Sequence, residues 1–151
     1  MQERANLIQR EFKNEYIKAC INILYTSSFM LKMKTKVLRP FNLSLQQFNI
    51  LNILNNKYPA PSTMKLLAEQ MLDETSNVSR LVEKLRKKDL ISRTNSEKDR
   101  RQVEISITKE GLDIFSKSAS ALEEITKFQL GNLSLSEVTH LNELLDKTRS
   151  V

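Results

Sequence analysis

Glycine is nearly absent from this chain. It occurs twice in 151 residues, whereas its usual share is about 7%, and there are only three prolines. Because these two residues punctuate strands and turns, their scarcity predicts a mainly α-helical chain. The glycine motifs GxGxxG, GxxxxGK[ST] and GxSxG are all missing. Dinucleotide-binding, P-loop NTPase and α/β-hydrolase functions therefore have no support in the sequence.

Cysteine and histidine each occur once, as Cys20 and His140. A lone cysteine forms no internal disulfide, which is typical of a reducing compartment. One histidine and one cysteine are too few for a metal site built from such ligands, so we expect no bound metal and no other cofactor. No nucleophile–base pair is visible either, so we do not expect an enzyme. The N-terminus lacks a signal-peptide core, and no run approaches the roughly 18 apolar residues of a membrane span. We expect a cytoplasmic protein without membrane contact.

Positive charge is concentrated in one segment. The formal net charge is +6, and residues 80–101 carry nine bases and four acids, which gives +5 of that total. Such a local field favours a polyanionic partner. Taken alone, the charged stretch NSEKDRRQVEI at 95–105 would be only a solvated turn between strands, so its neighbours in the chain decide its meaning.

The chain begins with a long helical pattern. Apolar residues recur at helical spacing from about Ile8 to Leu38, over more than one face, and Pro40 ends the predicted helix. A helix with this much apolar surface must be covered by another part of the chain or by a second subunit. A partner subunit is the economical choice in a small protein, and a central core helix is the alternative.

Shorter elements follow. Ser44 and Gln47 have capping-box spacing at the start of a second helix, which the turn KYPAPS stops. TMKLLAEQM forms a third helix that starts at Ser62 or Thr63. SNVSRLVEKLRKKD forms a fourth, with one narrow apolar stripe composed of Val78, Leu81, Val82 and Leu85.

Two strands and two helices complete the chain. LISR and QVEISI are predicted as strands on either side of the charged tip. Thr108 is the expected N-cap of a helix that runs to about Gln129, and Ser134 and Glu137 form a second capping box in the closing helix.

Two short helices joined by a polar turn and followed by a hairpin predict a winged helix-turn-helix. Outside its apolar stripe, the second of these helices carries short hydrogen-bonding side chains and bases, which suit base edges and phosphates in a major groove. The candidate recognition-helix residues are Thr75, Ser76, Asn77, Ser79, Arg80, Lys84 and Arg86.

The charged hairpin would form the wing beside this helix. A wing can reach over the DNA backbone and place arginine in the minor groove. The candidate wing residues are Lys98, Asp99, Arg100 and Arg101. Asp99 and Arg101 point the same way on a strand-like tip, so the acid could hold the guanidinium by bidentate pairing.

Four motifs occur in a recognisable order: L-x-L-x-x-F-x-I-L-x-I-L at 43–54, RLVEKLRKKDLISR at 80–93, EKDRR at 97–101 and ISITKEG at 105–111. With the long first helix, this order resembles the MarR transcriptional regulators over nearly the whole chain. The most specific part is DRR followed by the strand and TKEG. Asp89 stands where many members have glycine. Because aspartate tolerates a left-handed conformation, we expect only a small local adjustment there.

The resemblance implies one MarR-like domain over 1–151, with a mainly α fold (an α+β winged helix). It places the winged helix-turn-helix and its two-stranded wing at about 44–108, and dimerisation helices at about 8–38 and 122–151. It also implies a homodimer that binds a pseudo-palindromic site in double-stranded DNA, as a sequence-specific transcriptional repressor. A small aromatic or lipophilic effector would release that DNA.

Two alternatives stay open. The peroxide-sensing OhrR branch of the MarR regulators carries its reactive cysteine at a position similar to Cys20, which would make this chain a redox sensor. That branch surrounds the cysteine with tyrosines, where this chain has Leu24, Lys34 and Leu45, so a noncovalent ligand between dimer arm and winged domain is the preferred hypothesis. The second alternative is a winged-helix module whose basic face binds an acidic protein.

Overall fold

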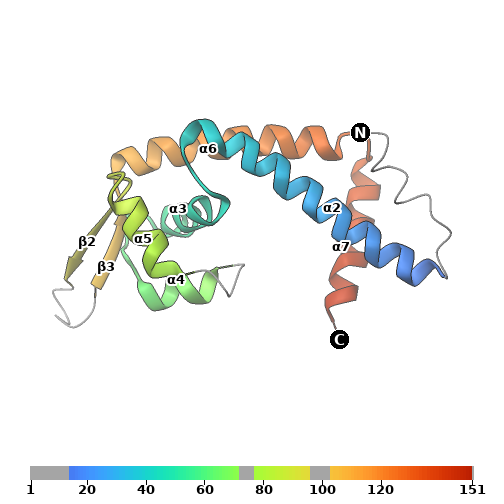
Figure 1. The fold of residues 1–151 in the computed structure, drawn as a ribbon, viewed down its shortest axis with the longest axis horizontal. Helices are drawn as coiled ribbons and strands as arrows, with labels where there is room; N and C mark the ends of the chain where they lie inside the picture. Colours follow the sequence, from blue (N-terminus) through green and yellow to red (C-terminus); the bar gives the residue numbers. More distant parts are fainter. Residues whose placement is uncertain (1–13, 72–76, 96–102, 151) are drawn as a thin grey trace.

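The computed structural model describes residues 14–71, 77–95 and 103–150, and Figure 1 shows how they are arranged. The helices and strands, in chain order, are α2 (Glu15–Leu38), the short 3-10 helix η1 (Arg39–Phe41), α3 (Leu45–Lys57), β1 (Ser62–Thr63), α4 (Met64–Gln70), α5 (Val78–Arg86), β2 (Ile91–Asn95), β3 (Val103–Ile107), α6 (Lys109–Leu130) and α7 (Leu135–Arg149). The mainly helical winged-helix fold predicted from the sequence is confirmed.

The molecule has a winged-helix part and an arm (Figure 1). Helices α3, α4 and α5 and the small sheet form the winged-helix part. Helices α2 and α6 pack against each other and lead away from it, and α7 lies at the far end of the arm, beside the N-terminal half of α2. The first and last described helices therefore lie together in the arm, away from the winged helix.

Local capping explains where several helices begin. Both predicted capping boxes form, at Ser44 with Gln47 and at Ser134 with Glu137. The expected helix start at about Ile8 lies outside the described residues, and within them α2 begins at Glu15. Asn14 has an extended backbone, and its side-chain oxygen accepts a hydrogen bond from the Ile17 N–H at 3.0 Å, which sets the helix start.

The sheet has three antiparallel strands in the order β1-β3-β2. The predicted hairpin is present, and β2 pairs with β3 from Ile91 opposite Ile107 to Asn95 opposite Val103. The third strand, β1, was not predicted. It pairs Ser62 with Ile105 on the other edge of β3 and leads directly into α4.

One hydrophobic core holds the winged helix to the arm. It is built from fully buried side chains of several elements, which include Leu38, Ile50, Leu51, Leu54, Leu67, Val82, Leu85 and Ile105. Leu38 comes from the last turn of α2, and Phe48 of α3 stacks on Phe115 of α6 with ring centroids 5.4 Å apart. Both arm helices are therefore anchored in the core of the winged-helix part.

A close contact fixes the start of α6 against the turn after α5. The Thr108 hydroxyl donates to the Asp89 carbonyl at 2.7 Å, and the Thr108 N–H donates to the Leu90 carbonyl at 3.1 Å. Gly111, one turn into α6, lies so near that a Cβ atom there would be 2.0 Å from the Leu90 carbonyl oxygen. The glycine of the TKEG motif therefore permits this helix–turn packing.

Candidate nucleic-acid interface

Helix α5 begins one residue after its N-cap, Asn77. The Asn77 side-chain oxygen accepts a hydrogen bond from the Arg80 N–H at 3.0 Å. The prediction that Asn77 lies within the first turn of the helix is wrong. Asn77 precedes the first residue of α5, and its side-chain oxygen caps the helix N-terminus. The candidates Thr75 and Ser76 lie outside the described residues.

The two faces of α5 differ in burial. Val78, Val82 and Leu85 of the predicted apolar stripe are buried, whereas Leu81 is half-buried. The described candidates outside the stripe are all exposed, namely Ser79, Arg80, Lys84 and Arg86. The helix therefore turns its hydroxyl and basic side chains outward while its apolar stripe fixes it to the core.

Arg86 is held by a neighbour on the same helix. Its Nε and Nη2 atoms donate to the two carboxylate oxygens of Glu83, at 3.0 and 2.9 Å. This hydrogen bonding lowers the pKa of Glu83 below its ordinary value and raises the pKa of Arg86 above its own. The pair is solvent-exposed, so its effect is to orient the guanidinium more than to stabilise the fold.

The end of α5 is a tight left-handed turn. The Leu90 N–H donates to the Leu85 carbonyl and the Asp89 N–H donates to the Arg86 carbonyl, at 3.1 and 2.9 Å. These two bonds are those of a Schellman motif. Asp89 has φ 57°, the left-handed conformation expected at the position where many MarR members have glycine. This turn connects α5 directly to β2, which begins at Ile91.

The wing strands are described, but their tip is not. β2 ends at Asn95 and β3 begins at Val103, directly opposite it. The four candidates Lys98, Asp99, Arg100 and Arg101 fall between them, outside the described residues. Arg93, an exposed base on β2, was not among the candidates, and strand alternation does not indicate it, because residues two apart such as Ile91 and Arg93 lie on the same face of a strand.

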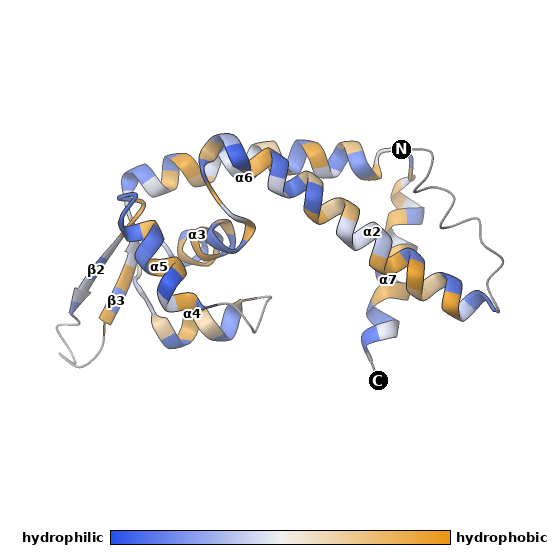
Figure 2. Ribbon diagram, in the orientation of Figure 1, coloured by the Kyte–Doolittle hydropathy of each residue, from blue (hydrophilic) through white to orange (hydrophobic). Residues whose placement is uncertain are grey.

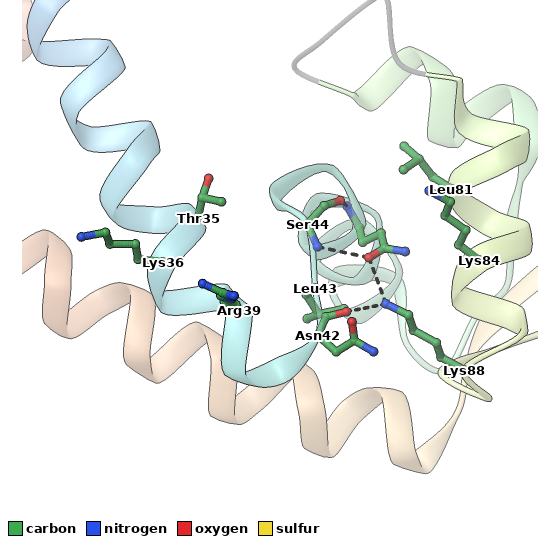
Figure 3. Close-up of a pocket in the computed structure, with 10 residues that line it drawn as sticks. Thr35, Lys36, Arg39, Asn42, Leu43, Ser44, Leu81, Lys84 and Lys88 are labelled. Atoms are coloured by element: carbon green, nitrogen blue, oxygen red, sulfur yellow. Dashed lines mark hydrogen bonds between the residues drawn. The ribbon is translucent and has the colours of Figure 1, made fainter.

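A cavity of about 660 Å³ separates α5 from the arm. It is bounded by the end of α2, by η1, by the start of α3 and by the last turns of α5, as Figure 3 shows. Four of its ten lining residues are basic (Lys36, Arg39, Lys84 and Lys88) and none is acidic. The cavity is therefore electropositive, and no pattern in the sequence indicates that these four bases converge.

Cys20 lies on α2 and is exposed. On a helix it shares a face with Ile17 and Leu24, which are also exposed. Among the described residues, no group of His, Cys, Asp and Glu side chains could hold a metal ion. None of the described helices is long and apolar enough to cross a membrane.

Comparison with known proteins decides the family. The MarR family model matches residues 43–103. Over 112 residues the chain is 36% identical to the HTH-type transcriptional regulator MgrA of Staphylococcus aureus, and the match covers 74% of each chain. This chain belongs to the MarR family. It is also 28% identical over 131 residues to the S. aureus regulator SarZ, with 85% of this chain and 86% of SarZ covered.

Solved structures of MarR-family regulators share the fold. AbsC of Streptomyces coelicolor superposes with a TM-score of 0.81 at 23% identity, covering 93% of this chain and 95% of AbsC. A mutant of E. coli MarR in complex with operator DNA gives 0.77 at 21% identity, covering 92% and 99%. The organohalide-sensing regulator RdhR in its 2,4-dichlorophenol-bound form gives 0.80 at 23%, covering 93% and 85%. With the sequence relatives, these make the chain a winged-helix transcriptional regulator of the MarR family rather than an enzyme.

Proposed function

We propose that this regulator binds a pseudo-palindromic operator as a homodimer and leaves it when a small molecule occupies the cavity beside the recognition helix. The observation that carries the DNA-binding part is the exposed polar face of α5, with Ser79, Arg80 and Lys84 outward and the opposite stripe buried. Hydroxyl and basic side chains on one helix face suit the base edges and phosphates of a major groove. The solved complex of the MarR mutant with operator DNA supports this use of the fold.

The arm supports the homodimer. Large apolar side chains remain exposed along α2, at the end of α6 and on α7; they include Tyr16, Ile21, Leu24, Phe29, Phe128, Leu135 and Leu144. Helix α7 has no buried residue at all, and Figure 2 shows hydrophobic residues along the N-terminal half of α2 and on α7, where the two helices meet. Such a contiguous apolar surface is unusual for a monomer, and we infer that a second copy of the chain covers it.

The arm also contains an apolar cavity of about 590 Å³ between α2 and α7, lined by residues such as Ile23, Met30, Leu141 and Leu145. Because it continues the exposed apolar surface, we assign it to side chains of the second copy. The effector is then assigned to the electropositive cavity near α5, whose Leu43 and Leu81 supply apolar contacts. An aromatic ring that carries an anionic group fits this lining. RdhR with bound 2,4-dichlorophenol shows that the fold accommodates a small aromatic molecule.

Selection of bound sequences from random double-stranded DNA tests the DNA-binding part. We expect recovery of a site with two related half-sites about one helical turn apart. We also expect affinity for it to fall steeply as salt rises, because phosphate contacts release counterions. Recovery of no preferred sequence, together with tight binding to an acidic protein, would instead favour the winged-helix interaction module.

Cys20 is the alternative sensor, since it is exposed in the single chain. Treatment with stoichiometric organic hydroperoxide separates the two modes of release. We expect operator binding to survive this treatment, and release by an aromatic anion to be the same in the parent and in Cys20→Ser. Release by peroxide that disappears in Cys20→Ser would make the chain a redox sensor.

A further inference from the structure

Lys88 behaves differently from the other bases of the segment 80–101. It lies within the Schellman turn at the end of α5, directly before Asp89, and its side chain folds back toward the turn between η1 and α3. There its ammonium donates to the backbone carbonyl of Asn42, and to the side-chain oxygen of Gln47 at 3.3 Å. The two acceptors are 46 and 41 residues away in sequence, so the contact joins distant parts of the fold.

Both acceptors are held in place by local structure. Asn42 caps η1 in the left-handed conformation, with φ 55°. Gln47 is buried, and its side-chain oxygen also accepts the Ser44 N–H at 3.1 Å as part of the capping box of α3. The Lys88 ammonium therefore meets two preorganised oxygens at the corner where the arm enters the winged helix.

The electrostatics agree with a fixed rather than a solvated amine. Partial burial, and the nearby charge of Lys84, lower the pKa of Lys88 below its ordinary value. Among the described residues, no carboxylate forms an ion pair with it. The Lys88 ammonium is held by two neutral oxygens at the edge of the cavity. It is therefore not available to bind a DNA phosphate.

We propose that Lys88 is a positioning residue that sets the orientation of the recognition helix relative to the arm. The apolar stripe of α5 anchors the helix to the core, but stripes of this kind allow small rotations and shifts, whereas a hydrogen-bonded ammonium specifies one position. Since the cavity separates α5 from α2, the Lys88 contact is a direct polar link at its edge. This inference rests on the proposed DNA-binding dimer, in which the arms set the distance between the two recognition helices.

The consequence is specific to two-site binding. In a dimer, the second half-site is bound at an effective concentration that depends on how well the two recognition helices are prepositioned. Loosening α5 should therefore weaken binding to a complete operator and leave binding to an isolated half-site nearly unchanged. A lysine that contacted phosphate directly would weaken both, and its loss would reduce the salt dependence of binding by about one phosphate contact.

The test uses Lys88→Met, which keeps an unbranched apolar side chain, with Lys87→Met as the exposed neighbouring control and Lys88→Arg as the conservative variant. We expect Lys88→Met to lower affinity for the complete operator by about tenfold and for a half-site by less than about twofold, with an unchanged salt slope. Lys88→Arg should recover most of the affinity. Equal losses on both DNAs, a reduced salt slope, or no loss at all would overturn the proposal.

A DNA-free measurement separates this proposal from the proposed function. Spin labels at Lys32→Cys in α2 and Ser79→Cys in α5, in a Cys20→Ser background, report the arm-to-recognition-helix distance. Dilution with unlabelled protein limits the signal to single chains. The distance distribution should broaden in Lys88→Met and stay narrow in Lys87→Met, whether or not the protein binds DNA. An unchanged distribution in Lys88→Met would overturn the positioning role even if the operator is confirmed.

Discussion

The Glu83 carboxylate holds the Arg86 guanidinium through two parallel hydrogen bonds, at 3.0 and 2.9 Å, on the exposed side of α5. Arg80 lies six residues before Arg86, and its side chain is exposed while its backbone N–H donates to the side chain of the N-cap residue Asn77. We therefore expect Arg80→Ala to weaken operator binding by about 1–3 kcal/mol. Arg86→Ala should cost less, because its guanidinium already has an anionic partner. Fluorescence anisotropy with a labelled operator measures both.

Thermal unfolding of the same two variants provides the control, since neither should lower the melting temperature appreciably. A larger loss of DNA affinity for Arg86→Ala than for Arg80→Ala would contradict this order. It would mean that Glu83 presents Arg86 to DNA instead of competing with it.

The wing gives the second prediction, which rests on the family resemblance. Arg101→Ala should weaken operator binding by about 1–3 kcal/mol, with helicity and oligomeric state unchanged. Asp99→Ala should give a similar or smaller loss, because it removes the group expected to orient the arginine. Binding isotherms and circular dichroism check this. Tighter binding by Asp99→Ala would show that the acid only repels DNA.

The arm gives the third prediction. Leu24 on α2 is 63% exposed in the single chain, and we expect it to be buried by a second copy. Leu24→Glu would then place an unpaired charge in that interface and weaken the dimer by roughly 3 kcal/mol or more. Sedimentation equilibrium measures the association constant.

Lys32→Glu is the matched control, because Lys32 is an exposed polar residue on the same helix. It should dimerise like the parent. Removal of residues 134–151 should yield monomer or aggregate and abolish binding to a two-half-site operator. A well-folded monomer of the parent chain at micromolar concentration would disprove the proposed assembly.

The fourth prediction concerns the joint between α6 and the turn after α5. Gly111→Ala would put a methyl group 2.0 Å from the Leu90 carbonyl oxygen and 2.8 Å from Cγ1 of Ile107. Backbone on one side and a packed side chain on the other leave little room to relax, so we expect a loss of about 1–3 kcal/mol in the free energy of unfolding. Urea denaturation measures this loss. The exposed Ser116→Ala, farther along the same helix, should have little effect, and a parent-like Gly111→Ala would refute the packing argument.

Short-range features of this fold could be predicted from sequence, and long-range ones could not. The capping boxes at Ser44 and Ser134 depend on residues three positions apart, so the sequence contains the whole interaction. Strand β1 depends on Ile105, which lies 43 positions after Ser62. Two residues give no alternation to detect, and only the folded chain brings that partner to them.

The candidate site divides in the same way. Burial of Val82 and exposure of Arg80 follow from helical periodicity, so the outward face of α5 could be predicted. Lys88 looked like one more base in a charged run. Its contact with the Asn42 carbonyl joins two turns 46 residues apart, and no local pattern distinguishes it from its exposed neighbour Lys87.

The last prediction concerns the acid sensitivity of α7. The Ser134 N–H and hydroxyl both donate to the Glu137 carboxylate, each at 2.7 Å, and they lower the pKa of Glu137 below its ordinary value of 4.5. The folded chain thus favours the charged form. The resulting stabilisation is fully present above the unfolded pKa and is lost as pH falls through the lower folded value. The parent should therefore melt above Glu137→Gln at pH 7, and this difference should shrink as the pH falls below 4.5 and disappear below the folded pKa of Glu137. Calorimetry at fixed protein concentration measures it, with the exposed Glu124→Gln of α6 as control. A difference between parent and Glu137→Gln that does not change with pH would show that the carboxylate charge contributes nothing to the cap.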